Sequence, residues 1–396
     1  MKKMMEKCEK YGFNNFSRFP IVIESAKDGY MFDTEGTKYL DFMGGIAVNS
    51  VGYDDEDFKN SLKDQIDKII HCSNLYYNEA HVKATELLSK VSGYEKVFFC
   101  NSGTEANEAA MKLARIFGKS GKNGATKIIA FKNSFHGRTL GALSVTGQPK
   151  YQKDFTPLIP DILFAEYNNF ESVVELVDES VCALIMEPVQ GEGGVISADK
   201  DFAKAVRELC TKENIMLIYD EVQTGIGRSG KLFDFEQLDV RPDVLTLAKG
   251  LGGGVPVGAI CADDKFAHFF TPSTHGTTFG GNPLASRAVE YVLSRISDES
   301  FLKDVKNKGD YFIGKLGELK KKYPFIKKIN GNGLLLGLVI DDKFAAADIV
   351  KKALENKLLL LTAGNNTVRF APALTITPDL IDRGLEILDK IFESIN

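Results

Sequence analysis

Short, continuously apolar runs alternate with amphipathic segments between about residues 60 and 295. Segments such as 202–212 and 285–296 carry the spacing of helices. The runs are apolar at successive positions, which is typical of strands covered on both faces of a mostly parallel sheet. The pattern therefore predicts an α/β domain with helices on both faces of the sheet. The predicted strands are 97–100, 127–131, 183–186, 216–219, 245–247 and 258–261.

The two ends of the chain follow a different pattern. Near the start, segments 29–32 and 38–42 flank turn residues at 33–36, which predicts a β-hairpin. Beyond about residue 300, strands and helices alternate over shorter lengths, so we expect a smaller α+β domain built from both termini. We place residues 1–50 in this small domain, 51–298 in a large ligand-binding domain and 299–396 in the C-terminal part of the small domain. The late elements predicted are a strand at 334–340, a helix at 346–355, strands at 358–361 and 368–370, and a helix from 378.

Polar residues follow the predicted strands, where ligands bind in open α/β sheets. Lys249 ends the run 244–248 and precedes a glycine-dense stretch. Desolvation there would favour its neutral amine, the form that condenses with a carbonyl. Asp220 ends another run. An acid and a lysine at two strand ends suggest a pyridoxal phosphate (PLP) site, in which the acid faces the pyridine nitrogen.

The stretch from Ser102 to Glu105 lies between a strand and a helical pattern. One interpretation is an ordinary helix start, in which Ser102 and Glu105 form a capping box. The other is a phosphate site, because free N–H groups and the positive helix end attract an anion and Gly103 lets it approach.

Further candidates have simple structural alternatives. Phe135 could stack on a planar ring or belong to the core, and Arg138 could bind a carboxylate or form a surface ion pair. Glu192 and Arg369 would by default form exposed salt bridges. His136 receives no catalytic role, and the loop around Thr278 is interpreted as a turn.

Composition restricts the function classes. The 396 residues are 44% hydrophobic and 26% charged, as in soluble globular proteins. A net charge of −5 gives no indication of nucleic-acid binding. The six scattered cysteines favour reduced thiols over disulfides or a metal site. The sequence shows neither a signal peptide nor a membrane-spanning run, so we expect a cytoplasmic protein that binds no metal, no nucleic acid and no membrane.

Six motifs together resemble the class III, PLP-dependent aminotransferases of the type I fold. The resemblance extends from about residue 16 to 392 and implies PLP as the cofactor. The motifs, in chain order, are NSGTEANE from Asn101, FHGRT from Phe135, EPVQGEGG from Glu187, DEVQTGIGR from Asp220, LAKGLGGGVPVGA from Leu247 and HGTTFGGNP from His275.

The resemblance also implies roles for individual residues. Lys249 would link covalently to the coenzyme and shuttle the proton, while Asp220 would keep the ring nitrogen protonated. Arg138 and Arg369 would hold substrate carboxylates, and Glu192 would pair with Arg369 until a dicarboxylate arrives. The remaining contacts implied are Gln223 to the ring hydroxyl, Phe135 to the ring face, Ser102, Gly103 and Thr104 to the phosphate, and Thr278 to the phosphate bound by the other subunit of an obligate homodimer.

Within the family, segments 44–49 and 71–77 look most like acetylornithine aminotransferases. Ornithine aminotransferases have substrate-binding tyrosines where this chain has Gly45 and Phe16, and Gly45 leaves room for an acylated nitrogen. The resemblance implies transfer of the δ-amino group of N2-acetylornithine to 2-oxoglutarate. Where the family often has Gly-His, this chain has Gly52-Tyr53, in a stretch expected to cap a helix.

Other functions remain open at this stage. The chain could transfer amino groups from ornithine, succinylornithine or 4-aminobutyrate. It could be a mutase or racemase of the same fold, although the Arg369 and Glu192 pair argues against this. From another class, the chain could be a non-enzymatic PLP-binding or regulatory protein. The presence of both Lys249 and Asp220 argues against this alternative.

Overall fold

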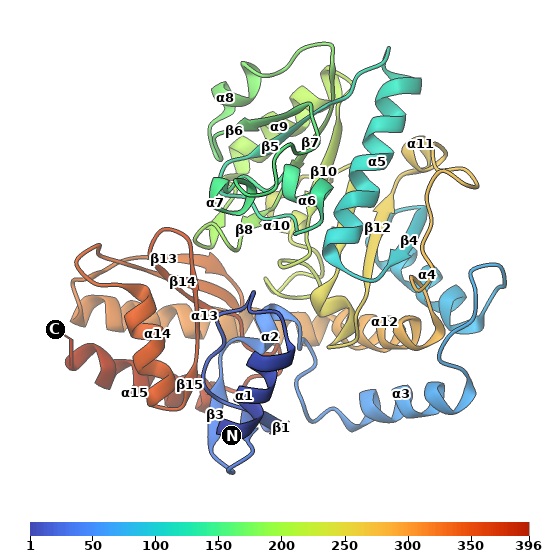
Figure 1. The fold of residues 1–396 in the computed structure, drawn as a ribbon. Helices are drawn as coiled ribbons and strands as arrows, with labels where there is room; N and C mark the ends of the chain where they lie inside the picture. The colour runs from blue at the N-terminus through green and yellow to red at the C-terminus, as the bar shows by residue number, and fades with distance from the viewer. Residues whose placement is uncertain (396) are drawn as a thin grey trace.

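A seven-stranded sheet forms the central layer of the larger part of the molecule (Figure 1). The computed structural model describes residues 1–395. Neighbouring strands are parallel except at β12, which is antiparallel to both of its neighbours. In spatial order the strands are β4 (Lys96–Cys100), β12 (Gly258–Ala262), β11 (Val244–Leu247), β10 (Met216–Asp220), β7 (Val181–Met186), β5 (Lys127–Phe131) and β6 (Ile162–Ala165).

Both faces of this sheet are covered, which explains the continuous apolar runs. In β10, Met216 and Ile218 pack in the core that contains α5 (Gly103–Gly121). Leu217 and Tyr219 pack in the other core, with residues of α9 (Lys200–Lys212). The mixed α/β fold with a mostly parallel sheet is therefore confirmed. The edge strand β6 was not predicted, although its four residues are all apolar.

A group of longer helices packs beside the sheet. The helices α3 (Glu56–Lys68) and α4 (Glu79–Ser92) both pack against α12 (Pro283–Ile296). Asp55 caps α3 by accepting a 2.9 Å hydrogen bond from the N–H of Phe58, so the predicted helix cap is confirmed. Shorter helices are α6 (Leu140–Ser144), α7 (Pro149–Gln152), α8 (Phe170–Val174), α10 (Phe235–Leu238) and α11 (Asp264–Ala267).

Segments from the two ends of the chain form two smaller sheets. The predicted hairpin is confirmed as β2 (Tyr30–Asp33) and β3 (Lys38–Asp41), with β1 (Ile23–Lys27) on its outer side. The strand β15 (Leu358–Leu359) pairs with β3 in parallel, so blue and orange-red segments lie side by side in Figure 1. The second sheet, wholly antiparallel, has the order β13 (Ile326–Asn332), β14 (Leu335–Ile340), β17 (Thr367–Phe370) and β16 (Leu361–Ala363).

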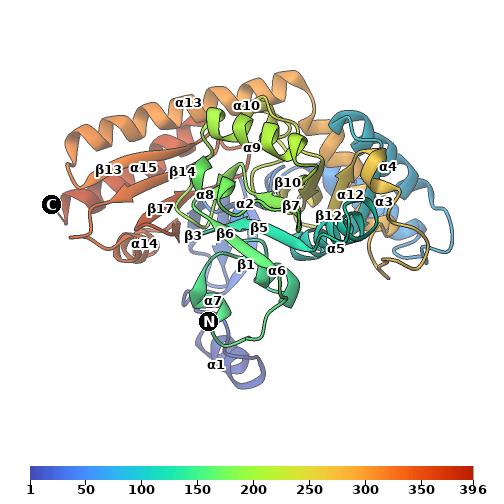
Figure 2. The ribbon, with the colours of Figure 1, turned by 90° about the horizontal axis from the view of Figure 1, so that it is seen from above.

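Three helices cover this end of the molecule, as the view from above shows (Figure 2). They are α13 (Glu299–Lys322), α14 (Ala346–Glu355) and α15 (Pro378–Glu393). The N-terminal helix α1 (Lys2–Tyr11) buries no residue, and α2 (Gly44–Ala47) is a left-handed turn. None of the helices within residues 1–395 is long and apolar enough to cross a membrane.

Candidate active site

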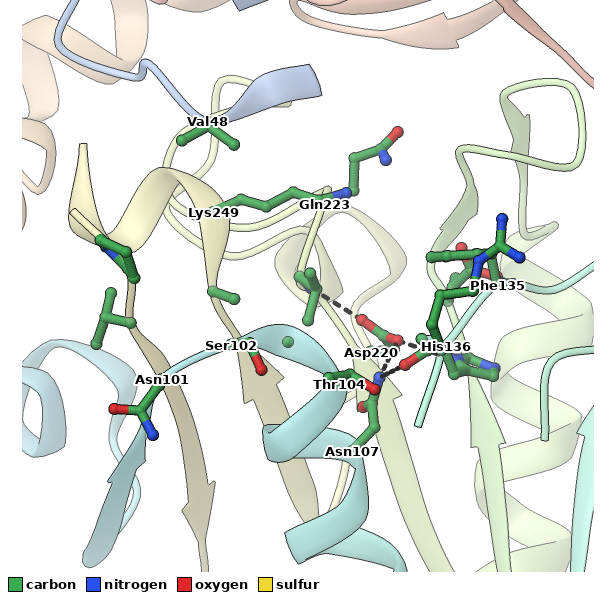
Figure 3. A pocket seen from close by; sticks show the side chains of 18 of the residues that line it. Val48, Asn101, Ser102, Thr104, Asn107, Phe135, His136, Asp220, Gln223 and Lys249 are labelled. Atoms are coloured by element: carbon green, nitrogen blue, oxygen red, sulfur yellow. Dashed lines mark hydrogen bonds and ion pairs between the residues drawn. The ribbon is translucent and has the colours of Figure 1, made fainter. Parts of the chain in front are cut away.

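A cavity of about 450 Å³ lies where the central strands end. Figure 3 shows side chains from separate strands and loops converging on it. The sequence-predicted residues that line it are Ser102, Gly103, Thr104, Phe135, Arg138, Glu192, Asp220, Gln223 and Lys249.

Lys249 enters the cavity from the end of β11. It begins the 3₁₀ turn η1 (Lys249–Gly252) with φ of +43°, a conformation that residues with a Cβ rarely adopt. Burial lowers the pKa of Lys249, and the negative charge of Glu192 opposes that effect only in part. The amine is thus shifted toward the neutral form that reacts with carbonyl groups.

Asp220 is held by a buried hydrogen-bond network. Its Oδ2 accepts 2.7 Å bonds from Asn107 Nδ2 and from His136 Nδ1, and its Oδ1 accepts a 2.9 Å bond from the N–H of Val222. The hydroxyl of Thr246 fixes Asn107 in turn, through a 2.8 Å bond to Oδ1. The carboxylate keeps lone pairs for a further donor, because two oxygens can accept about four hydrogen bonds.

His136 is therefore a site residue that the sequence reasoning missed. Its ring is buried against Asp220, and Nδ1 must carry the proton when that carboxylate is ionised. Its Nε2 has no hydrogen-bond partner within residues 1–395. The only signal in the sequence was the position of His136 after a predicted strand, and that position did not reveal its partner 84 residues away.

Glu187 directly follows β7 and lines the cavity. Burial and then the nearby charge of Asp220 raise the pKa of Glu187 well above its ordinary value. Its Oε2 accepts a 3.1 Å bond from the N–H of Phe135 and so helps to fix the backbone that carries this ring.

The start of α5 faces the cavity with Ser102 as its cap. Ser102 Oγ accepts a 3.3 Å bond from the N–H of Glu105. The predicted reciprocal bond is wrong, because Glu105 accepts from the N–H of Asn101 at 2.6 Å instead of from Ser102. A Cβ on Gly103 would lie 2.6 Å from a methyl carbon of Val222, so only glycine fits there without a shift. The helix end can therefore receive an anion closely.

Arg369 and Glu192 form an ion pair of 2.5 Å across the cavity edge, and not on the surface. Arg369 is 3% exposed, so the default of an exposed salt bridge is wrong. Gln223 joins the pair, since Arg369 donates to its Oε1 at 3.1 Å and its Nε2 donates to Glu192 at 3.3 Å. Although burial acts to raise the pKa of Glu192, the charge of Arg369 and its hydrogen bond lower it overall.

Arg138 lies at the exposed rim of the cavity. Its guanidinium carbon is 3.9 Å from the ring centre of Tyr151 and 5.5 Å from that of Phe135. Within residues 1–395 it has no acidic partner, so the predicted alternative of a surface ion pair is not observed. Stacking holds the guanidinium plane and leaves its N–H groups for a carboxylate.

Three candidates do not line this cavity, and one of them, Arg369, contacts its lining residues Glu192 and Gln223. The other two lie elsewhere. Gly45 lines a second, apolar cavity of about 900 Å³ that it shares with Phe16 and other N-terminal residues. Thr278 is exposed on the loop that precedes α12. Within residues 1–395, no group of three His, Cys, Asp or Glu side chains is placed to hold a metal ion.

The cavity residues fit PLP as a group. Lys249 offers an amine for its carbonyl, Asp220 a buried carboxylate for its ring nitrogen, and the start of α5 a site for its phosphate. The half-buried ring of Phe135 and the side chain of Val222 supply apolar surface for the pyridine ring.

Comparison with known proteins identifies the family. Residues 12–392 match the class III aminotransferase family. An acetylornithine aminotransferase from Caldanaerobacter subterraneus is 46% identical, with 98% of each chain covered. A succinylornithine transaminase from Photorhabdus laumondii is 45% identical, again with 98% of each covered. The crystal structure of an ornithine aminotransferase from Toxoplasma gondii superimposes with a TM-score of 0.95 at 32% identity, covering 100% of this chain and 95% of that one. The chain belongs to the class III aminotransferases.

Proposed function

We propose that this enzyme transfers the δ-amino group of N2-acetylornithine to 2-oxoglutarate. The products are N-acetylglutamate 5-semialdehyde and glutamate, and the reaction is a step of arginine biosynthesis. The observation that carries the proposal is buried Arg369, paired with Glu192 at the edge of the cavity that holds Lys249. An arginine beside a carboxylate that can release it suits an enzyme whose two substrates carry different numbers of carboxylates. The name of the Caldanaerobacter relative supports the choice of donor.

The cavity would hold PLP through residues of several strand ends. When bound, PLP supplies a carbonyl that takes up amines and a ring that holds the electron pair released at the substrate carbon. Asp220 keeps a proton on the ring nitrogen, and Lys249 moves a proton at the substrate carbon that carries the amino group. The other contacts proposed are Ser102, Gly103 and Thr104 with the phosphate, Phe135 with the ring face and Gln223 with the ring hydroxyl.

The two arginines divide the recognition of carboxylates. Arg138, exposed and stacked on Tyr151, binds the carboxylate of N2-acetylornithine and one carboxylate of 2-oxoglutarate. After Glu192 has released Arg369, this arginine binds the second carboxylate of 2-oxoglutarate. The Arg369 and Glu192 pair thus excludes water and charge from this end of the cavity while the monocarboxylate donor is bound.

The acyl group of the donor lies toward the N-terminal segment in this proposal. Gly45 is exposed, and it lines the second cavity together with Phe16. Because neither residue carries a hydroxyl, this wall offers no hydrogen bond to a free α-amino group. An acylated nitrogen, which bears no charge, loses less solvation on approaching such a surface.

We also propose a homodimer in which Thr278 of the partner subunit reaches the phosphate site. Apolar side chains are exposed near this threonine: Tyr77 is 99% exposed, and Leu75 is 86% exposed. Asn74 ties their segment to the loop by donating to the carbonyl of Thr277 at 3.0 Å. A patch of this kind is usually covered by a partner. Sedimentation of the wild type and of Tyr77→Glu tests this, and a monomeric wild type would contradict it.

The test of the proposed function is a comparison of amino donors. N2-acetylornithine, N2-succinylornithine, ornithine and 4-aminobutyrate are each added to the purified holoenzyme, and the loss of the coenzyme absorbance gives kcat/KM for the first half-reaction. We expect N2-acetylornithine to give the highest value and 2-oxoglutarate to restore the absorbance. A preference for ornithine or 4-aminobutyrate would refute the assignment. Free cysteines throughout the chain support a cytoplasmic location for the reaction.

A further inference from the structure

The segment between β3 and α3 contains a left-handed turn that few sequences would adopt. Gly44, Gly45, Ile46 and Ala47 have φ values of +53°, +65°, +67° and +62°. Glycine adopts such values readily, but a residue with a Cβ rarely does, least of all a β-branched residue such as Ile46. Backbone of this kind persists only where the surroundings determine it.

Asp41 holds the start of this turn by hydrogen bonds. Its Oδ1 accepts bonds from the N–H of Met43 at 2.8 Å and of Gly44 at 3.1 Å. Its Oδ2 accepts a 2.6 Å bond from the hydroxyl of Tyr53, on the far side of the turn. No cation pairs with Asp41 within residues 1–395, so these donors stabilise a buried carboxylate by themselves. Burial raises the pKa of Asp41, although the hydrogen bonds oppose this effect.

Tyr53 closes the turn from its other end. Its hydroxyl donates to Asp41 and accepts a 3.1 Å bond from Asn49 Nδ2. The turn is therefore enclosed between Asp41 before it and Tyr53 after it. This arrangement belongs to the residues of this chain, because the sequence departs from the family's Gly-His pattern at Tyr53.

The turn forms part of the walls of both cavities. Val48 lines the cavity of Lys249, and its side chain lies near that of the lysine in Figure 3. Gly45, three residues earlier, lines the second cavity beside Phe16. Ser50 Oγ donates to the carbonyl of Gly250 at 2.8 Å, which joins the segment to the turn that carries Lys249. The segment thus lies between the two cavities and contributes to the wall of each.

We propose that Asp41 and Tyr53 are positioning residues that set the fit of the amino donor. Their hydrogen bond keeps the left-handed turn in the conformation that places Val48 over the cavity and Gly45 in the N-terminal cavity. The wall so formed contacts the part of the donor beyond its reacting amino group. This inference rests on the proposed function, since it assumes a donor long enough to reach from one cavity toward the other.

The recognition of 2-oxoglutarate does not depend on this wall. Arg369 is held separately, by Glu192, Gln223 and a 3.2 Å bond to the carbonyl of Gly191. Loosening the turn therefore affects the amino donor more than the keto acid. A residue that only stabilised the fold would change neither Michaelis constant selectively.

The test uses the holoenzyme of Tyr53→Phe, which loses the hydroxyl and keeps the ring. The matched control is Tyr311→Phe, because Tyr311 is also half-buried and donates to Asp382 at 2.7 Å, in the contact between α13 and α15. KM and kcat are measured for N2-acetylornithine and 2-oxoglutarate, with the coenzyme absorbance as a check of PLP content. Asp41→Asn serves as a second variant that alters the same hydrogen bond at its acceptor.

We expect Tyr53→Phe to raise KM for N2-acetylornithine about three- to tenfold, the ratio that corresponds to one ordinary hydrogen bond. Its kcat, its PLP content and KM for 2-oxoglutarate should change less than about twofold, and Asp41→Asn should shift KM in the same direction. Tyr311→Phe should leave both KM values unchanged. Equal changes in both KM values, or no change in Tyr53→Phe, would overturn the inference. A wild type that does not use N2-acetylornithine would instead refute the proposed function.

Discussion

Replacing Glu192 with glutamine should make the enzyme accept glutamate more readily. In the proposed function, a second substrate carboxylate binds Arg369 by displacing Glu192, which is 2.5 Å from the guanidinium. Glutamine keeps an oxygen that accepts a hydrogen bond but removes the charge. A hydrogen bond to a charged group contributes about 1.5–3 kcal/mol. The carboxylate of Glu192 is about a quarter exposed, so we take the lower end of that range.

A difference of about 1.5 kcal/mol corresponds to a factor of roughly ten. We therefore expect kcat/KM for L-glutamate to rise about tenfold relative to kcat/KM for N2-acetylornithine. The assay follows the coenzyme absorbance in the half-reaction with each donor separately. Arg369 also loses its countercharge, so the thermal midpoint of Glu192→Gln should fall.

Glu290→Gln is the matched control for this prediction. Glu290 forms a 2.7 Å pair with Arg287, and its side chain is 21% exposed, close to the 25% of Glu192. It lies on α12 and does not line the cavity. Its substitution should leave the ratio of the two donors unchanged. If Glu192→Gln left the ratio unchanged or lowered it, the pair would not be the group that glutamate displaces.

Three further predictions concern the coenzyme site. Because burial lowers the pKa of Lys249, the rate at which the apoprotein takes up PLP should reach half of its maximum at a pH below about 10.4, the pKa of an ordinary lysine. A midpoint at or above that pH would contradict this prediction. His136→Phe removes one of three donors to Asp220, so kcat should fall about tenfold with little change in KM; an unchanged kcat would show that the other donors suffice. Gly103→Ala places a Cβ 2.6 Å from Val222, so fluorescence titration should show PLP binding weakened about tenfold or more, whereas unchanged affinity would mean that the helix end adapts.

The pattern of apolar residues was sufficient to predict most of the sheet. Strands such as β10 are buried on both faces, and this burial leaves a continuous run that is visible in the sequence. The convergence of Asp220 and Lys249 also followed from the sequence, since residues at the carboxyl ends of parallel strands meet at one edge of the sheet. Of the seven strands of this sheet, β6 was not predicted, although its four residues are all apolar.

The hydrogen-bond partners could not be predicted in the same way. His136 and Asp220 are 84 residues apart, and Arg369 and Gln223 are 146 apart, so no local spacing links them. Only one of the two hydrogen bonds of the capping box at Ser102 is formed, because Glu105 accepts from the N–H of Asn101 and not from that of Ser102.

The sequence by itself determined which amines, acids and hydrogen-bond donors are available at the strand ends, because covalent identity and strand position fix them. The tertiary structure alone decided the conformation of the turn at residues 44–47. Local preference disfavours a left-handed conformation at Ile46 and Ala47. The hydrogen bonds of Asp41 and Tyr53, formed only when β3 and the start of α3 come together, stabilise it against that preference.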